Sequence, residues 1–566
     1  MDCQSIHRKG RNLKVPRIII VTLLLLGSSE WLAAEKAASA LRGRVSSKEE
    51  GSMEGVLVSA RKDGSTVTTS VVSDSRGEYS FPKDRLESGH YSIRIRAAGY
   101  DLADPKTGVD IGNRPGRLDL NLVPTRDLAA QMTNADWLFS APGAEEQRKA
   151  LLNCQHCHTM ERIFRSHHTP EELQKVMHRM GTYYEGTTPQ HPQLLKPMPA
   201  QIREYFSPAD VDYVSSIILG AGSDWKYPLK TLPRPKGEQT KAIVTEFELP
   251  RKGALPHDAV VDREGMIWYC DHGAPYVGRL DPKTSNVVEF PTPILKPGFP
   301  TGCHFIEQDA DGNLWITLGA QGGAAKFDRH TQTFKSWSLP QMSDNPEPMA
   351  YALMVENAKS DGQVWVMEST GRRIQRLNVN TGTWLDPFPL FQDIPENSPA
   401  SRRRHFVYDM HSDSKDTVYL LDYYSEFIGK MDFRTGKTVL MQTPTFDSGP
   451  RRGHIDSQGR VWFGEYRGNR IGMFDPGTGG FKEWEMPIAF SGPYDVVVDK
   501  QGFAWTSGMT SDRVFRLNIQ TGKVVDYLLP SPTNARRVEV DDSKQPIAFW
   551  TGSNHGGVLV RLEPRE

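Results

Sequence analysis

Two cysteines and a histidine lie close together in the segment Leu151–Met160, LLNCQHCHTM. Cys154 and Cys157 are separated by two residues, and His158 follows directly. This C-x-x-C-H spacing is the attachment signal for a c-type haem, because each thiol can bond one vinyl group of the same porphyrin. The adjacent imidazole can then bind the iron as its proximal ligand. The sequence therefore predicts one covalently attached haem c.

Two other chemistries use closely spaced thiols. A zinc site needs a second pair of ligands at a suitable spacing, and His167 and His168 follow Cys157 more closely than zinc fingers require. A redox-active dithiol is typical of a βαβ setting, whereas this motif lies among helical patterns. Zinc, a dithiol and a plain disulfide are kept as alternatives to haem.

Residues 126–225, which contain the motif, are predicted to be helical. The segment TPEELQKVMHRM begins with Thr169 as N-cap and has Glu172 three residues later, which together form a capping box. Pro170 occupies the first helical position, where proline is favoured. The segment SPADVDYVSSIIL repeats this pattern from Ser207. The region is thus expected to hold a small helical domain.

This helical region resembles a class I cytochrome c over about residues 145–220. The attachment residues of that family are matched by Cys154, Cys157 and His158. The resemblance implies a sixth iron ligand, usually a methionine in the loop before the last helix. Met198 occupies that place, and Met180 is the alternative. Further options are His178 and His191. A haem with an axial methionine would transfer single electrons.

The N-terminus has the pattern of a secretory signal. Five basic residues between Arg8 and Arg17 precede the apolar run Ile18–Gly27, and small residues follow it. The run is short for a membrane span, so residues 1–34 are expected to be cleaved as a signal peptide; a retained anchor is the alternative. No other apolar run in the sequence is long enough to span a bilayer. These features predict a periplasmic or secreted protein with no integral membrane span after cleavage.

Residues 41–125 contain short runs in which apolar and polar residues alternate, such as GHYSIRIRAAGY, separated by Gly, Asp and Ser turns. This pattern predicts β-strands. The order of the runs resembles the carboxypeptidase regulatory-like domain, an Ig-like β-sandwich. No cluster of cysteine, histidine or acidic residues indicates a site there, so the region is interpreted as a structural or docking module.

From residue 240 to residue 566, beyond a linker at 226–239, one pattern repeats seven times. Each repeat has a β-run, an Asp/Gly turn and a second β-run led by an aromatic residue. These anchor aromatics, spaced 43–54 residues apart, are Trp268, Trp315, Trp365, Tyr419, Trp462, Trp505 and Trp550. Four strands in each repeat predict a seven-bladed β-propeller, with IVTEFELP completing the last blade. A solenoid is the alternative, but its repeats would be shorter.

The chain as a whole is therefore predicted to be multidomain and mainly β. It would combine an Ig-like β-sandwich, a small α-helical cytochrome c domain and a seven-bladed β-propeller. In each blade, the start of the first strand and the end of the second should lie on one face near the axis. Residues at these positions are expected to form a funnel that binds a ligand. The alternative is that they form ring-closing hydrogen bonds or solvated loops.

The funnel residues can be grouped by strand. At the first-strand starts are His257, His304, Tyr351, Tyr408, Arg451, Tyr494 and Arg536. At the second-strand ends are Asp271, Glu368, Asp422 and Glu465. Arginines that precede or begin first strands are Arg402–Arg404, Arg451, Arg452, Arg536 and Arg537. They indicate either a solvated basic rim or a site for an anionic substrate or for haem propionates.

Cys270 and Cys303 are expected in adjacent blades on the same face of the propeller. In an oxidising compartment they could form a disulfide. Two other interpretations are separate buried thiols and a metal site with nearby imidazoles. The histidines available for such a site are His257, His272 and His304.

The repeats GRVWFGEYRGNRIGMFDP and SGPYDVVVDKQG resemble the virginiamycin B lyase (streptogramin lyase) family over most of residues 240–560. In that family one blade supplies a Glu-x-His and a second Glu for catalysis and magnesium binding. Glu465 matches the second Glu, but Gly449 and Arg451 replace the pair. Arginine cannot serve as a base at neutral pH, and His454 is out of register. The candidate catalytic residues are thus Glu465, Arg451 and His454, and neither C–O lyase activity nor magnesium is supported.

A haem beside a ligand-binding propeller predicts an exported monohaem cytochrome that mediates electron transfer. The electrons would come from a small-molecule substrate, with anionic ones favoured by the arginines, or from a partner dehydrogenase. Two alternatives are a lyase-like enzyme and a propeller binding scaffold, each with an accessory haem. The sequence leaves open whether the chain is itself an enzyme or an oxidoreductase component. A net charge of −1 gives no indication of nucleic acid as a partner.

Overall fold

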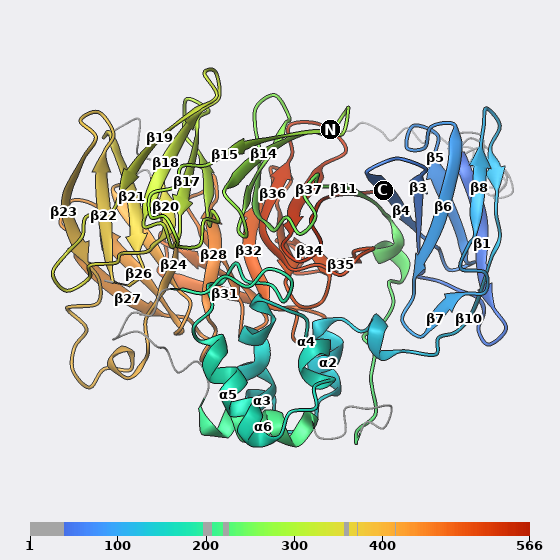
Figure 1. Ribbon diagram of the computed structural model, residues 1–566, viewed down its shortest axis with the longest axis horizontal. Helices are drawn as coiled ribbons and strands as arrows, with labels where there is room; N and C mark the ends of the chain where they lie inside the picture. Colours follow the sequence, from blue (N-terminus) through green and yellow to red (C-terminus); the bar gives the residue numbers. More distant parts are fainter. Residues whose placement is uncertain are drawn as a thin grey trace, which may run out of the picture.

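The computed structural model describes residues 39–195, 207–218, 226–355, 361–370, 372–413 and 415–565. The predicted signal peptide at 1–34 and the predicted ligand Met198 lie outside these residues. A β-sandwich, a helical region and a propeller lie side by side in Figure 1, with the helices gathered against one face of the propeller. No helix in the described part of the chain is both long enough and apolar enough to cross a membrane.

The N-terminal domain is a β-sandwich of two sheets, as predicted. The strands of one sheet are β1 (Ser39–Ser47), β2 (Gly51–Ser52), β5 (Glu78–Pro82), β7 (Tyr100–Leu102), β9 (Gly116–Arg117) and β10 (Leu120–Pro124). The strands of the other are β3 (Leu57–Lys62), β4 (Val67–Val72), β6 (Gly89–Arg96) and β8 (Gly108–Ile111). Alternating apolar residues from both sheets, including Leu41, Val58 and Phe81, form a common buried core.

The helical region is small, and its longest helices have 11 residues each. Its elements are η1 (Ala129–Gln131), α2 (Asn134–Ser140), α3 (Glu145–Ala150), η2 (Leu151–His156), α4 (Met160–Phe164), α5 (Pro170–Met180) and α6 (Pro208–Ile218). The capping box predicted for α5 is present, because Thr169 Oγ1 accepts from the Glu172 amide at 3.2 Å and Glu172 Oε2 accepts from the Thr169 amide at 2.9 Å. The motif Cys154–His158 begins in η2, between α3 and α4.

Six blades of the propeller are consecutive four-stranded antiparallel sheets. Blades 1 and 2 comprise β12 (Pro256–Val261), β13 (Ile267–Asp271), β14 (Tyr276–Asp281), β15 (Asn286–Pro291), β16 (Ile306–Gln308), β17 (Leu314–Leu318), β18 (Gly323–Asp328) and β19 (Thr333–Ser338). Blades 3 and 4 comprise β20 (Ala350–Met354), β21 (Gln363–Glu368), β22 (Arg373–Asn378), β23 (Thr383–Pro389), β24 (Val407–Ser412), β25 (Thr417–Asp422), β26 (Phe427–Asp432) and β27 (Thr438–Gln442). Blades 5 and 6 comprise β28 (Pro450–Ile455), β29 (Val461–Glu465), β30 (Arg470–Asp475), β31 (Gly480–Glu485), β32 (Pro493–Val498), β33 (Phe503–Gly508), β34 (Arg513–Asn518) and β35 (Val524–Leu528).

The seventh blade closes the ring with strands from both ends of the propeller sequence. Its strands are β36 (Ala535–Asp541), β37 (Ala548–Ser553), β38 (Val558–Pro564) and β11 (Ala242–Glu248). Strand β11, the IVTEFELP segment, pairs with β38 as predicted. Its other edge pairs with β4, so one eight-stranded sheet runs from blade 7 into the sandwich. This pairing covers a strand edge that would otherwise be open to association.

A repeated hydrogen bond explains the Asp/Gly turn and the anchor aromatic of the sequence repeats. In four blades the tryptophan Nε1 donates to the aspartate six residues before it, at 2.7–3.0 Å. The pairs are Trp268–Asp262, Trp315–Asp309, Trp462–Asp456 and Trp505–Asp499. The same carboxylates accept backbone amides of the turn. The aspartate therefore fixes the turn and the ring together.

The first strand of nearly every blade contains a register shift at the axis. In β12 it falls between Pro256 and Asp258, and equivalent shifts occur in β20, β24, β28, β32 and β36. Such a β-bulge re-aims side chains and leaves one residue outside the ladder. Two consecutive residues of these strands can therefore face the centre of the propeller.

Candidate functional site

The seven predicted first-strand residues lie around the propeller axis and form what we call the axial ring. Its members are His257, His304, Tyr351, Tyr408, Arg451, Tyr494 and Arg536, and each is at most 5% exposed. Ring centroids are 4.6 Å apart for His257–His304, 4.1 Å for His304–Tyr351 and 5.0 Å for Tyr351–Tyr408. The structure thus brings this half of the predicted funnel together.

Arg451 lies in a cage of four tyrosines. Its guanidinium carbon is 4.0–4.7 Å from the ring centroids of Tyr408, Tyr423, Tyr466 and Tyr494. Its Nη2 donates to His156 Nε2 at 3.0 Å. Aromatic faces stabilise a desolvated cation, and arginine keeps its charge because it does not deprotonate. The cage therefore holds a permanent positive charge next to the Cys–Cys–His segment.

The carboxylates at the second-strand ends do not join the axial ring, which corrects the expected funnel. Asp271 pairs with Arg251, Glu368 accepts from Asn345 and Gln375, and Asp422 accepts from Ser425 and pairs with His405. These carboxylates are used for contacts with loops and neighbouring strands. Glu465 is buried, and neither of its oxygens has a hydrogen-bond partner among the described residues.

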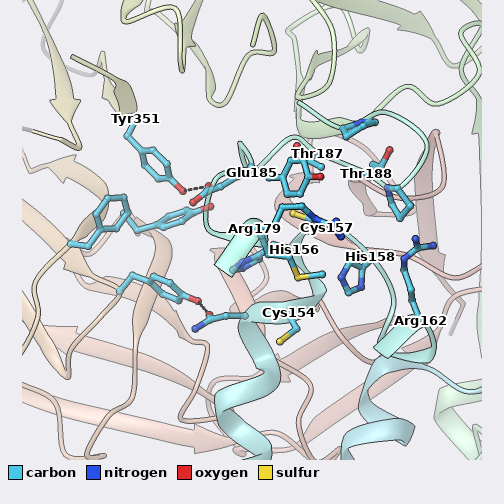
Figure 2. Close-up of a pocket in the computed structure, with 18 of the residues that line it drawn as sticks. Cys154, His156, Cys157, His158, Arg162, Arg179, Glu185, Thr187, Thr188 and Tyr351 are labelled. Atoms are coloured by element: carbon cyan, nitrogen blue, oxygen red, sulfur yellow. Dashed lines mark hydrogen bonds between the residues drawn. The ribbon is translucent and has the colours of Figure 1, made fainter. Parts of the chain in front are cut away.

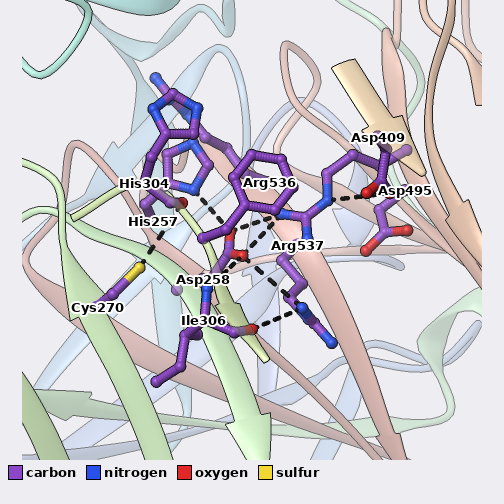
Figure 3. Close-up of polar contacts among 12 residues, drawn as sticks. His257, Asp258, Cys270, His304, Ile306, Asp409, Asp495, Arg536 and Arg537 are labelled. Carbon is purple, nitrogen blue, oxygen red and sulfur yellow. Dashed lines mark hydrogen bonds and ion pairs between the residues drawn. The ribbon is translucent and has the colours of Figure 1, made fainter. Parts of the chain in front are cut away.

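A second layer of charged residues lies next to the axial ring, contributed by the residues that follow ring members in the chain. This ionic layer consists of Asp258, Asp409, Arg452, Asp495 and Arg537, with Glu307 (Figure 3). Arg452 Nη1 lies 2.8 Å from both carboxylate oxygens of Asp258, and Arg537 Nη2 lies 3.2 Å from Glu307 Oε2. Burial opposes ionisation of Asp409, but His411 and Arg452 lower its pKa to about 2.

This ionic layer was not predicted from the sequence as a unit. The signal was present as adjacent pairs at the first-strand starts: His257–Asp258, Tyr408–Asp409, Arg451–Arg452, Tyr494–Asp495 and Arg536–Arg537. A regular strand sends consecutive side chains to opposite faces, so only the bulges bring both residues of a pair inward. The predicted basic rim is correspondingly wrong for these arginines, which are buried; Arg402 and Arg404 are exposed.

The segment that carries the cysteines docks on the axial ring. Arg536 Nη2 donates to the backbone oxygen of His156 at 3.0 Å, and Tyr423 donates to Asn153 Oδ1 at 2.6 Å. Gln155 Nε2 donates to the Tyr466 hydroxyl at 2.6 Å, and that hydroxyl donates to the Leu152 oxygen at 2.8 Å. These bonds satisfy polar groups of a helical turn that would otherwise be buried without partners. The propeller axis is thus covered by the Cys–Cys–His segment.

Cys154, Cys157 and His158 line one pocket between the helical region and the propeller (Figure 2). The pocket has about 1260 Å³ of space free of protein atoms, including its open mouth. Propeller residues on its wall are Tyr351, Phe406, Tyr408, Tyr423, Tyr424 and Arg451. From the helical side come Arg162, Arg179, Met180 and Glu185, and Glu185 accepts a hydrogen bond from Tyr351 at 2.9 Å.

Both cysteines of the motif are free thiols. Burial raises the pKa of Cys154 to about 12 and that of Cys157 to about 11. A reactive dithiol has a lowered thiol pKa, so the geometry gives no support to the dithiol alternative. The described residues contain no group of three or more His, Cys, Asp or Glu side chains arranged to hold a metal ion, and His167 and His168 are exposed. Zinc therefore gains no support either.

The imidazole of His158 is neutral and held in one tautomer. Its Nδ1 lies 3.0 Å from the backbone oxygen of Thr159, which places the ring proton on Nδ1. Nε2 has no hydrogen-bond partner among the described residues, so its lone pair is free. Burial lowers the pKa of His158, which keeps the ring neutral. A backbone acceptor that fixes the tautomer is the usual arrangement of a metal-binding histidine.

Of the proposed sixth ligands, Met180 lines the same pocket as His158. His178 and His191 are exposed and do not line this pocket. Within the described residues, Met180 is therefore placed near His158, whereas Met198 lies beyond them.

The second pair of cysteines is also free and buried. Cys270 Sγ lies 3.7 Å from the His304 oxygen, and Cys303 Sγ lies 3.8 Å from the Tyr276 oxygen. The structure does not contain the predicted disulfide. It contains two separate buried thiols, which is the second of the interpretations given above. The ring centroids of His257, His272 and His304 lie 4.6–4.8 Å from one another. The described residues nevertheless form no metal-binding group there.

The three candidate lyase residues lie in different environments. Arg451 is in the tyrosine cage, and His454 Nε2 lies 3.5 Å from Asp495 Oδ1 at the ionic layer. Burial, reinforced by Glu483, raises the pKa of Glu465 to about 9, so this carboxyl is protonated at neutral pH. A protonated carboxyl is neither a base nor a good ligand for magnesium.

Comparisons with known proteins found similarity to two parts of the chain. Residues 40–123 match the family model of the carboxypeptidase regulatory-like domain, which confirms the resemblance of the sandwich. A streptogramin B lyase structure is 19% identical, with 58% of this chain and all of that chain covered and a TM-score of 0.49. Virginiamycin B lyase from Staphylococcus aureus is 18% identical, with 57% of this chain and all of that chain covered and a TM-score of 0.47. No curated protein matches the chain.

Proposed function

We propose that the protein is an exported monohaem c-type cytochrome whose haem lies between the helical region and the propeller. One observation carries this proposal: the thiols of Cys154 and Cys157 and the free Nε2 of His158 belong to one pocket. Their spacing suits two thioether bonds and one iron ligand. When bound, the haem would supply a centre that accepts and donates single electrons.

The pocket provides the other contacts that a porphyrin needs. Tyr423, Tyr424 and Phe406 offer aromatic faces, and burial of flat apolar area is the main source of stabilisation for such a ligand. Arg162 and Arg179 line the same pocket and would pair with the propionates, since guanidinium groups bind carboxylates well. Met180, which lines this pocket with His158, would be the sixth ligand.

In this proposal the propeller forms one wall of the redox site. Arg451 fixes a positive charge at the pocket wall, and a fixed positive charge favours the reduced state of a nearby centre. The open mouth of the pocket leaves access for a small-molecule substrate or a redox partner protein on one side. An anionic donor would be favoured by the fixed positive charge of Arg451 at the pocket wall.

A pyridine haemochrome assay tests the proposal directly. The protein should be produced in a host that attaches c-type haem, and its absorption spectrum and intact mass should show one covalently bound haem. The double variant Cys154→Ala/Cys157→Ala should lose the covalent haem, whereas the matched variant Cys270→Ala/Cys303→Ala should retain it. A wild-type product that is colourless and has the mass of the bare polypeptide would reject the proposal.

A further inference from the structure

A chain of hydrogen bonds leads from the pocket wall into the ionic layer. Tyr408 lines the pocket, and its hydroxyl is hydrogen-bonded to the hydroxyl of Tyr494. The Tyr494 hydroxyl lies 3.4 Å from His257 Nε2, and His257 Nδ1 lies 2.6 Å from Asp258 Oδ1. We call Tyr408, Tyr494, His257 and Asp258 the axial relay.

The hydrogen bonds of the axial relay all point the same way. Asp258 is held by Arg452 at 2.8 Å from each oxygen, so its carboxylate is an acceptor only. His257 therefore donates from Nδ1, and its Nε2 must accept from Tyr494. Having donated, the Tyr494 oxygen accepts from Tyr408. A proton that enters at Tyr408 can thus be passed inward until His257 carries it.

His257 is an uncharged ring in mostly positive surroundings. It is fully buried and faces Asp258 of its own strand, Arg451 and Arg452 of β28, Tyr494 of β32, and Arg536 of β36. The remaining titratable neighbours are His272, which follows β13, and His304, which precedes β16. Burial, followed by the charge of Arg536, lowers the pKa of His257 well below its usual value.

We propose that the axial relay takes up one proton when the Cys154–Cys157–His158 site gains one electron. The inference rests on the proposed haem, and the electron comes from an external one-electron donor. One proton passes from solvent in the pocket to the Tyr408 oxygen, the Tyr408 proton passes to Tyr494, and the Tyr494 proton passes to His257 Nε2. The balance is one electron and one proton taken up, and only O–H and N–H bonds are exchanged.

The physical reason is charge balance in a buried site. An electron added to a site of low dielectric favours positive charge nearby. Arginines are already charged, whereas His257, at the inner end of the Tyr408–Tyr494 path, can still gain a proton. Asp258, at 2.6 Å from its Nδ1, stabilises the resulting imidazolium. Reduction therefore raises the pKa of His257.

A pH-dependent reduction potential follows from this coupling. The potential should fall as pH rises between the His257 pKa of the oxidised protein and that of the reduced protein. At full coupling the ratio of oxidised to reduced protein changes tenfold per pH unit, which is 59 mV for one electron. Above the pKa of the reduced protein, the potential should become constant.

The test uses the full-length protein with its haem attached. Spectroelectrochemical titration between pH 5 and 9 measures the slope. A pH-indicator dye in stopped flow measures proton uptake on reduction by hexaammineruthenium(II), a one-electron donor that releases no protons. The variant His257→Gln should lose the slope. Tyr494→Phe should keep the slope but slow proton uptake at least tenfold, because it removes the hydroxyl that passes the proton. The control Tyr419→Phe, in the middle of blade 4, should behave as wild type.

The outcomes separate this inference from the proposed function. A wild-type potential that is independent of pH, or a slope retained in His257→Gln, overturns the relay while the haem proposal stands. Proton uptake at the wild-type rate in Tyr494→Phe overturns the assigned path. A colourless wild-type protein rejects the haem, and the relay proposal falls with it.

Discussion

At the scale of single residues, the chemistry of the site depends on which groups keep a charge when buried. Arg451 and Arg452 stay cationic because the first lies among tyrosine faces and the second is paired with Asp258. Glu465 has neither kind of partner and is held neutral instead. Blade 5 thus contains a fixed cation, Arg451, and a neutral acid, Glu465.

Glu465 should make the protein less stable as pH rises. Its pKa is about 9 in the folded chain and near 4.5 when unfolded, so the folded state keeps a proton that the unfolded state loses. The stabilisation is fully present below pH 4.5 and is lost as pH rises towards 9, at up to about 1.4 kcal/mol per pH unit. Between pH 5 and 8, the melting temperature of Glu465→Gln should therefore fall less than that of the wild type.

Thermal unfolding followed by circular dichroism measures this difference. The control Glu485→Gln changes an exposed carboxylate at the end of β31 and should follow the wild-type curve. Parallel pH profiles for wild type and Glu465→Gln would show that Glu465 is ionised in the folded protein.

At the scale of elements, two features of β-strands decide the architecture. Bulges in the first strands turn two consecutive residues to the axis, which produces a ring and an ionic layer from one strand start. Edge pairing of β11 with β4 fuses the sandwich to blade 7. Sandwich and propeller are also joined by Arg96, whose Nη1 donates to the Leu529 oxygen at 2.7 Å and whose Nη2 donates to Asp512 Oδ2 at 2.6 Å.

Loss of the Arg96 contacts should loosen the sandwich from the propeller. Arg96→Ala leaves the buried Asp512 without this partner, and hydrogen bonds to charged groups contribute about 2 kcal/mol each. The melting temperature should fall by several degrees, and limited proteolysis near residue 125 should become faster. Arg117→Ala, which removes an exposed arginine that pairs within the sandwich, is the control. Equal stability of the two variants would mean that the β4–β11 pairing and the other ion pairs, such as Arg85–Glu563, hold the domains together without Arg96.

The elements were largely predictable because each has a local signal. The anchor aromatics and their turns predicted the propeller repeats, since the aspartate–tryptophan bond lies within one hairpin. Capping residues predicted the start of α5. Neither the bulges nor the β4–β11 pair could be found in this way, because both depend on partners that are distant in sequence or on the curvature of the closed ring.

At the scale of the whole molecule, the helical region is placed over the axis of the propeller. A hydrophobic cluster spans both regions, and specific hydrogen bonds add to it. His156 accepts hydrogen bonds from Arg451 and Arg536, and Tyr466 is hydrogen-bonded to Gln155 and Leu152. The pocket exists only because these two regions meet, since its walls come from both.

Tyr466 should control how tightly the motif segment is held. Tyr466→Phe leaves Gln155 Nε2 and the Leu152 oxygen without partners, at a cost of about 1–3 kcal/mol. Hydrogen exchange measured by mass spectrometry should therefore become roughly 5- to 150-fold faster in residues 151–158, since 1.4 kcal/mol corresponds to a factor of ten. Tyr213→Phe, which removes a hydroxyl that donates to Pro142 elsewhere in the helical region, should leave that segment unchanged. Unchanged exchange in Tyr466→Phe would show that other contacts hold the segment.

The sequence by itself determined the elements and the chemical types available: a Cys–Cys–His motif, a regulatory-like sandwich and seven β repeats. It also placed the seven ring residues at the first-strand starts, because strand periodicity and repeat spacing are local properties of the chain. Only the tertiary structure decided that the motif segment covers the propeller axis, that the second-strand carboxylates face elsewhere, and that a histidine between two layers is linked to the pocket. These are relations between residues up to several hundred positions apart, which burial and hydrogen-bond geometry set and no local pattern encodes.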